Sequence, residues 1–435
     1  MLKDNPWISA PDTLDAWLHR RLPDAFVPRL QLASAAERWS QADQAHLVVG
    51  PRQCGKSTAI WSWLARRAKP VLYVDCELSP VREWCRSPPL FLADLERLAP
   101  AGTPVFFDEI QHLDEAALFL KGLVDRRPGM PLLVTGSSSF QLRSRTRESL
   151  AGRASRTRLF PFSLAEACGD APLAPPAARA ATIRDRFERH VIFGGYPRAW
   201  LADRPEQVLL DLVEAILSRD ASDLGRIARP EAFRRLLRLA AGQAGNLVNF
   251  AEWSGLLGIS RDTVAAYVEI LESVHILVQL PPFAGGKRSE LTGRPKIFLV
   301  DNGLRNHLTG DFRRLADRVD AGAVLENWAF GELWKALPAG ATLHYWRSSS
   351  KAEVDFVVLT PGGPIGVEVK AHAMDRPRLE RSSRSFLDAY RPPRFVVLNL
   401  ELEHRETLDG VEVRWTTPEH LASAVLAPPP RPSRR

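Results

Sequence analysis

The sequence predicts a multidomain α/β protein, in which an open parallel sheet is followed by a mostly helical middle and a second, smaller α/β domain. Three patterns predict this fold class. Short apolar runs alternate with helical patterns over the first third of the chain, which is typical of a parallel sheet wound with helices. Apolar residues then recur at helical spacing. Near the end, two strand patterns flank a Pro-Gly-Gly turn.

Composition limits the class of protein further. A chain of 435 residues is long enough for about two to four domains. Its four cysteines, Cys54, Cys76, Cys85 and Cys168, show no CxxC spacing, so we expect reduced thiols and a cytoplasmic protein. The first residues are too charged for a signal sequence, and no apolar stretch could cross a bilayer. A net charge of +7 permits a polyanionic partner without requiring one.

The first strand pattern, residues 47–49, ends in a turn with the phosphate-loop spacing GxxxxGK[ST]. A helix is predicted over 58–67, so the turn joins a strand to a helix, where backbone N–H groups and the helix N-terminus bind phosphate oxygens. Lys56 would reach the β and γ phosphates of ATP, and Ser57 would hold Mg²⁺. The residues expected to bind the nucleotide here are Gly50, Pro51, Arg52, Gln53, Cys54, Gly55, Lys56, Ser57 and Thr58.

A strand over 71–74 and a helix over 90–98 lead to the third strand pattern, residues 105–107, which ends in Asp108 and Glu109. Ligands of doubly wound sheets bind at the carboxyl ends of the strands. We therefore expect Asp108 to hold Mg²⁺ through the water shell of the metal, and Glu109 to orient and deprotonate the attacking water. An acidic helix cap after an ordinary strand is the alternative.

The fourth strand pattern, residues 131–134, runs into a serine-rich segment. Ser137 or Ser138 would sense the γ phosphate, unless the segment is only a turn. Arg153 is a candidate phosphate-sensing or trans-acting arginine. In a chain this rich in arginine, a solvated surface residue is the simpler interpretation.

Taken in order, these motifs resemble a known family. The series GPRQCGKST, VFFDEIQ, TGSSS, LAGR, LFPFSLAE and FGGYP, over roughly residues 40–372, is similar to the prokaryotic AAA-like ATPases that carry a C-terminal domain of unknown function, family 4143. The resemblance implies ATP binding and hydrolysis with Mg²⁺, but no settled substrate. The chain departs from the family at Cys54, where valine is common, and at Ser57, where serine replaces threonine and preserves the hydroxyl.

The middle of the chain is predicted to be helical. A Pro- and Ala-rich stretch at 171–181 predicts a linker. Helices predicted over 205–227 and 231–241 lead to a stretch that resembles a winged helix-turn-helix, with helices on both sides of Gly258 and a wing strand over 275–280.

The second helix of this motif is predicted to begin with Arg261, Asp262 and Thr263. These residues would meet DNA if the helix is a recognition helix. The alternative is that the motif packs on the ATPase as a lid or bridges subunits.

The last part of the chain carries a second set of acidic residues. Glu326 lies on a helix predicted over 324–337, Asp355 on a strand, and Glu368 and Lys370 on one face of the next strand of a hairpin. This set resembles the restriction-endonuclease-like core, in which carboxylates hold Mg²⁺ and the lysine helps to activate water. The alternative is a half-exposed edge strand whose charges only favour solubility.

The predicted layout leaves two functions open. One is an ATPase that uses ATP turnover to act on DNA, with cleavage of the DNA left open; the other is an ATP-dependent switch whose nuclease-like domain only binds nucleic acid or a protein partner. A small-molecule kinase is disfavoured by the Asp-Glu pair, and a homo-oligomer is left open. The expected segments are a helical lead-in (1–44), the P-loop ATPase domain (45–170), a linker (171–185), the helical and winged-helix region (186–295), the nuclease-like domain (296–426) and a disordered basic tail (427–435).

Overall fold

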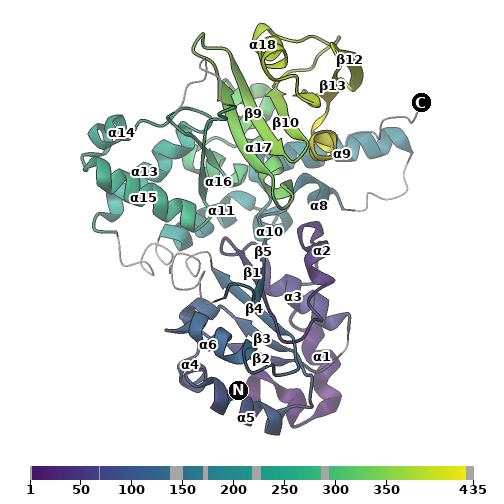
Figure 1. Cartoon of the computed structure of the whole chain (residues 1–435), viewed down its shortest axis with the longest axis vertical. Helices are drawn as coiled ribbons and strands as arrows, with labels where there is room; N and C mark the ends of the chain where they lie inside the picture. The colour runs from purple at the N-terminus through teal and green to yellow at the C-terminus, as the bar shows by residue number, and fades with distance from the viewer. Residues whose placement is uncertain are drawn as a thin grey trace. The chain divides into compact units, whose positions relative to one another are not determined.

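A computed structural model describes residues 2–67, 69–137, 150–169, 175–217, 227–285 and 293–427 (Figure 1). The chain divides into two compact units. The first contains Met1–Pro161 and Ser273–His275, and the second contains Phe162–Leu217, Arg226–Glu272 and Ile276–Arg435. In the described part of the chain, no helix is long and apolar enough to cross a membrane.

The first unit is built on a five-stranded parallel sheet of order β2-β3-β4-β1-β5. The four predicted strands are confirmed, and β5 is an addition. Because β4 lies between β1 and β3, the strand before the phosphate loop and the strand before the acidic pair are not neighbours. The strands are β1 (Ala45–Gly50), β2 (Leu72–Asp75), β3 (Val105–Asp108), β4 (Leu132–Ser137) and β5 (Ala154–Arg158).

Each face of this sheet has its own apolar core. One core joins α5 and α6 to the sheet through Phe91, Phe119 and Phe107. The other joins α3 to the N-terminal lead-in, whose Trp17 and Trp39 are buried. The helices are α1 (Leu14–His19), α2 (Ala33–Ala36), α3 (Lys56–Ala65), α4 (Ser79–Trp84), α5 (Pro88–Leu98) and α6 (Ala116–Val124).

The second unit begins with helices, and one of them corrects the predicted linker. Helix α9 (Pro176–Phe193) covers most of the segment 171–185, of which 171–174 lie outside the described residues. Proline is tolerated in a first helical turn, and alanine and arginine favour helix, so the composition that suggested a linker also suits a helix. Further helices are α8 (Leu164–Cys168), α10 (Pro197–Leu201), α11 (Pro205–Ala215), α13 (Pro230–Gly242) and α16 (Asn302–Thr309).

A helix-turn-helix lies where it was predicted. Helix α14 (Phe250–Leu257) ends at Gly258, whose φ of 65° is left-handed, and α15 (Arg261–Ser273) follows. Strand β6 (Leu277–Leu280) then pairs antiparallel with β7 (Lys296–Leu299). The predicted domain boundary between 295 and 296 is therefore wrong, because it separates two paired strands.

The second unit ends in a six-stranded mixed sheet of order β12-β13-β11-β10-β9-β8. Helix α17 (Ala321–Ala336) contacts both β10 and β7. Residues 428–435, predicted to be a disordered tail, lie outside the described residues. The remaining elements are β8 (Thr342–Arg347), β9 (Glu353–Thr360), β10 (Gly363–Val369), β11 (Arg394–Leu398), β12 (His404–Leu408), β13 (Val411–Thr416), α18 (Arg381–Tyr390) and α19 (Leu421–Leu426).

Candidate active site

The phosphate loop needs both of its glycines. A Cβ atom on Gly50 would lie 1.9 Å from the carbonyl oxygen of Leu159, so only glycine fits where the loop leaves β1. Gly55 precedes α3 with a φ of 91°, a left-handed conformation that costs glycine little. The thiol of Cys54 is buried and donates to the Leu159 oxygen at 3.2 Å, so this departure from the common valine contacts the residue that follows β5.

The lysine and the serine of the loop are both in place. Lys56 is only 4% exposed, and its Nζ donates to the carbonyl oxygens of Gly50 (3.3 Å) and Pro51 (3.0 Å). Ser57 Oγ donates to Asp108 Oδ1 at 2.7 Å. The end of β3 therefore lies beside the loop, as the sequence predicted.

Asp108 is held by hydroxyl groups. Besides Ser57, the hydroxyl of Thr135 donates to Oδ1, and Tyr73 Oη donates to Oδ2 at 3.2 Å. Burial raises the pKa of Asp108, while the hydroxyls of Thr135 and Ser57 oppose that shift. An oxygen-rich pair of Ser57 and Asp108 suits Mg²⁺, which prefers carboxylate and hydroxyl ligands.

Glu109 adopts a backbone conformation that is unusual for its residue type. Its φ of 52° is left-handed, and such strain often marks a functional position. The backbone N–H donates to Thr135 Oγ1 at 3.0 Å, and the carboxylate accepts from Gln111 Nε2 at 2.5 Å. Burial raises the pKa of the Cys54 thiol, and the charge of Glu109 adds to that effect, so the carboxylate lies near the loop.

Four further residues surround this site, and of these the sequence placed only Thr135 beside the strand end. Thr135 and Tyr73 bond to Asp108, and Arg29 Nη1 donates to the Cys54 oxygen at 2.5 Å. Asn5 exchanges two hydrogen bonds with the backbone of Tyr73, at 2.9 and 2.7 Å. The run of hydroxyl residues at the end of β4 pointed to Thr135, but no local pattern marks the other three.

Of three further residues predicted at the nucleotide site, one lies elsewhere, and the side chains of the other two lie outside the described part of the chain. Arg153 precedes β5, and its carbonyl oxygen accepts from Ala45 at the start of β1, so it lies at the opposite edge of the sheet from the phosphate loop. Its guanidinium pairs with Asp125 at 2.5 Å. The backbone of Ser137 pairs with Gly50, but its side chain, like all of Ser138, lies outside the described residues.

The second acidic set comes together in the second unit. The three carboxylates lie close together: Glu326 is on α17, Asp355 on β9 and Glu368 on β10. Burial is the largest cause that raises the pKa of Glu326 and of Glu368 to about 8, and the negative charge of Asp355 is the second. The Val369 N–H donates to Asp355 Oδ2 at 2.8 Å. Glu368 is 6% exposed, and its Oε2 has no hydrogen-bond partner among the described residues.

Two lysines hold these carboxylates. Lys370 Nζ lies 2.9 Å from Glu368 and 2.7 Å from Glu380. Lys296 on β7, which sequence reasoning missed, is 4% exposed and lies 3.0 Å from Glu326 and 2.6 Å from Glu353. In the described ranges, no three His, Cys, Asp or Glu side chains form a group that could hold a metal ion. The predicted residues thus converge, but as lysine-bridged ion pairs rather than as a preformed metal site.

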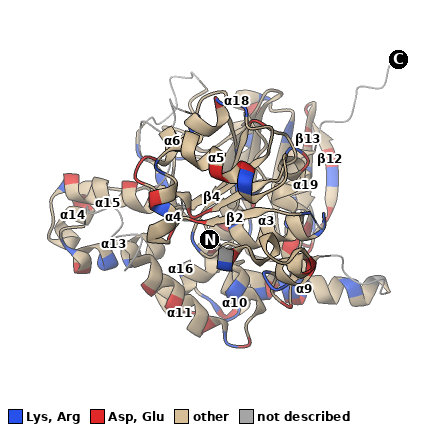
Figure 2. Cartoon of the chain, turned by 90° about the horizontal axis from the view of Figure 1, so that it is seen from below, with Lys and Arg blue, Asp and Glu red and all other residues tan. Residues whose placement is uncertain are grey.

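The expected DNA-contacting residues begin α15. Arg261 and Asp262 are exposed, whereas the Thr263 hydroxyl is paired with Ser260 Oγ at 2.8 Å. Lys and Arg residues are distributed over both units rather than gathered on a single element (Figure 2). DNA contact by this helix stays a prediction.

Three family models match the chain in order. They are an AAA domain over residues 42–168, a domain of unknown function (DUF8612) over 184–314, and a second one (DUF4143) over 321–417. An uncharacterized protein of Mycobacterium tuberculosis is 31% identical over 396 residues, which cover 88% of this chain and 81% of that protein. An uncharacterized protein of Haemophilus influenzae is 22% identical over 405 residues, covering 89% and 97%.

Solved structures are also similar, at low scores. The Thermotoga maritima RuvB Holliday junction branch migration motor is 19% identical, with a TM-score of 0.29 over 62% of this chain and 89% of its own. The FIGL-1 AAA domain in complex with ADP is 13% identical, with a TM-score of 0.27 over 44% and 82%. These scores are too low to carry anything from those proteins to this chain.

Proposed function

Since the chain belongs to the same family as the mycobacterial protein and carries an AAA domain, which supports ATP binding and hydrolysis, we propose that it is a Mg²⁺-dependent ATPase that acts on DNA. The observation that carries the ATPase proposal is the Ser57–Asp108 hydrogen bond, which puts the phosphate loop and the acidic strand end side by side. Glu109 follows directly, at the same strand end.

Each residue of this site has a chemical role in the proposal. The loop N–H groups and Lys56 bind the phosphates. Ser57 and Asp108 would hold Mg²⁺, which neutralises phosphate charge. Glu109 orients the attacking water and accepts its proton. Thr135 bonds both to the Asp108 carboxylate and to the Glu109 backbone, so one hydroxyl positions both acidic residues.

The action on DNA rests on the second unit. An exposed Arg261 at the start of α15 favours phosphate contact, while the neighbouring Asp262 opposes it. The cluster of Glu326, Asp355 and Glu368 with Lys370 has the residue types of a nuclease that needs a divalent cation. In this proposal the cation must displace the lysine ion pairs. Otherwise the second unit serves as a binding module controlled by ATP.

A cytoplasmic location belongs to the same proposal. All four cysteines are free of disulfides, and three of them are buried. Reduced thiols are the rule in the cytosol.

The test is ATP hydrolysis by the whole chain, measured without DNA and with single-stranded, duplex and branched DNA, with DNA products analysed in the same samples. Hydrolysis that DNA accelerates, together with cleavage that requires Mg²⁺ or Mn²⁺, supports the full proposal. Hydrolysis that no DNA alters and no cleavage leaves an ATPase whose second unit acts on something else. Absence of hydrolysis in every sample overturns the ATPase.

A further inference from the structure

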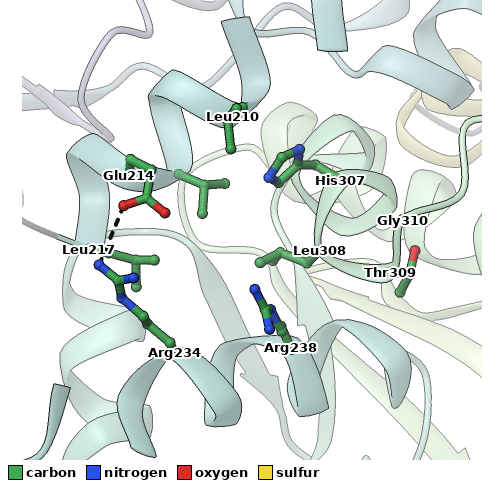
Figure 3. A pocket seen from close by; sticks show the side chains of 10 residues that line it. Leu210, Glu214, Leu217, Arg234, Arg238, His307, Leu308, Thr309 and Gly310 are labelled. Atoms are coloured by element: carbon green, nitrogen blue, oxygen red, sulfur yellow. Dashed lines mark hydrogen bonds and ion pairs between the residues drawn. The ribbon is translucent and has the colours of Figure 1, made fainter. Parts of the chain in front are cut away.

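A pocket of about 380 Å³ lies in the second unit, where α11, α13 and the C-terminal end of α16 meet (Figure 3). Its size is at the small end of the range for ligand pockets. Leu210, Leu217 and Leu308 supply apolar walls, and Arg234, Arg238 and His307 supply polar groups. These residues lie outside both acidic sites, and neither use of ATP nor contact with DNA involves them.

The pocket has an excess of positive charge. Arg234 and Arg238 are four residues apart on α13 and therefore share a face. Arg234 pairs with Glu214 at 3.4 Å, whereas Arg238 shows no ion pair or hydrogen bond among the described residues. Figure 3 shows its guanidinium pointing toward Leu308, with the His307 ring on the far side of that leucine. Among the residues that the structure describes, one cation at the pocket thus lacks a matching carboxylate.

The helix end at the pocket does not cancel this charge. The C-terminus of a helix repels anions because its last carbonyl groups lack partners. Here Gly310 N–H donates to the oxygens of Asn306 and His307, and the Thr309 hydroxyl donates to the oxygens of Arg305 and Asn306. The last turn of α16 is therefore largely satisfied, and a guanidinium carries twice the charge assigned to a helix end, about half an elementary charge.

We propose that this pocket binds a small amphiphilic anion, with a carboxylate head against Arg238 and a short apolar tail against Leu210, Leu217 and Leu308. Arginine donates two parallel N–H bonds to a carboxylate, which fixes the orientation of the head. Burial, and then the charge of Arg238, lower the pKa of His307 on the far side of Leu308. The tail removes the exposed leucine surface from water.

The test uses the whole chain and three eight-carbon probes, namely octanoate, octan-1-ol and octylammonium, in isothermal titration at pH 7. Octanoate should bind at one site, octan-1-ol about tenfold more weakly, and octylammonium not measurably, because one charge-assisted hydrogen bond is worth about 1.4 kcal/mol or more. Equal affinity for octanoate and octan-1-ol, or no octanoate binding at millimolar concentration, overturns the proposal.

Matched variants locate the site. Arg238→Gln should weaken octanoate binding about tenfold or more. Arg235→Gln, on the same helix, is the control, because Arg235 donates to the Leu256 oxygen at 2.8 Å and does not line the pocket. Leu210→Ser changes a side chain that is 41% exposed, so the fold should hold while octanoate, but not acetate, loses affinity. Equal losses in Arg235→Gln and Arg238→Gln, in proteins with unchanged melting temperature, exclude this site.

Discussion

The two acidic sites use the same residue types, yet their charges are satisfied in different ways. In the first unit, Lys56 donates to backbone carbonyls and Asp108 accepts from hydroxyls. In the second unit, Lys296 and Lys370 each hold two carboxylates. A hydrogen bond to a charged group contributes about 1.5–3 kcal/mol, whereas removing one partner of a buried ion pair costs about 3–5 kcal/mol. The first site is ready for exchange with a ligand, and the second is closed by its own cations.

The largest expected effect tests whether the first site binds and hydrolyses ATP. Glu109→Gln should lower the rate of ATP hydrolysis about 10²- to 10⁴-fold, because a general base is lost, while nucleotide affinity stays within about twofold. Lys56→Ala should instead lose tight ATP binding, since the phosphates lose their cation. Single-turnover hydrolysis and fluorescent nucleotide titration separate the two. Normal turnover by Glu109→Gln would show that another group is the base.

The next largest effect tests whether lysine ion pairs close the second site. Lys296→Met should destabilise the chain by about 3 kcal/mol in metal-free buffer, because Glu326 loses its counter-ion, whereas Glu353 keeps Arg347 at 3.6 Å. Added Mn²⁺ should restore part of that stability if the carboxylates can hold a metal. Urea unfolding with and without Mn²⁺ measures both effects. Lys351→Met, at an exposed position in a turn before β9, serves as the control; stability of Lys296→Met equal to that of the control contradicts the closure.

A pH series tests the burial of Glu326 at this site. The pKa of Glu326 is raised to about 8, first by burial and then by Asp355, so the folded state binds this proton more tightly than the unfolded state. The contribution to stability is therefore complete below about pH 4, near the ordinary glutamate pKa, and is lost as the pH rises toward 8 and beyond. The unfolding free energy should fall by at least about 1 kcal/mol from pH 5 to pH 9. Glu326→Gln should flatten that decline, and an identical slope in both proteins would refute this assignment.

The smallest expected effect lies in the hydroxyl set around Asp108. Tyr73→Phe removes one donor and keeps the ring, so stability should change by no more than about 1 kcal/mol. The Mg²⁺ dependence of ATP hydrolysis should shift toward higher concentration, because the carboxylate is less firmly held. Thr135→Val, which removes a bond to Asp108 and one to Glu109, should shift it further. The reverse order would show that the positioning role falls to Tyr73.

The parts of the fold that were predicted are those marked by local sequence. Residues 45–58 fix a strand, a turn and a helix through their spacing alone, and the Asp-Glu pair after an apolar run needs no distant partner to be recognised. The contacts of Tyr73 and Thr135 with Asp108 depend instead on strand order, because β2 and β4 flank β3. Strand order is not written in any single segment.

Lys296 and α9 show two further limits. Lys296 lies beside Glu326 because β7 pairs with β6. The two strands are separated by 15 residues in the sequence, and their hydrophobic patterns did not reveal that they pair. In α9, proline and alanine suit both a linker and a helix, and packing against α8 and α16 selects the helix. Tertiary contacts decided both cases.

The paired hydrogen bonds between Asn5 and Tyr73 have a practical consequence. Asn5 bonds to the Tyr73 backbone, and the Tyr73 hydroxyl donates to Asp108, the carboxylate that would hold the metal. Trp7 Nε1 adds a bond to the Val71 oxygen at 2.9 Å, next to the same strand. A truncated AAA domain that starts at residue 42, where the family model begins, would lack the hydrogen bonds of Asn5 and Trp7 to this part of the sheet. Its measured turnover would then come from a domain in which Tyr73 is less firmly held. Affinity tags for purification are accordingly better attached at the C-terminal end.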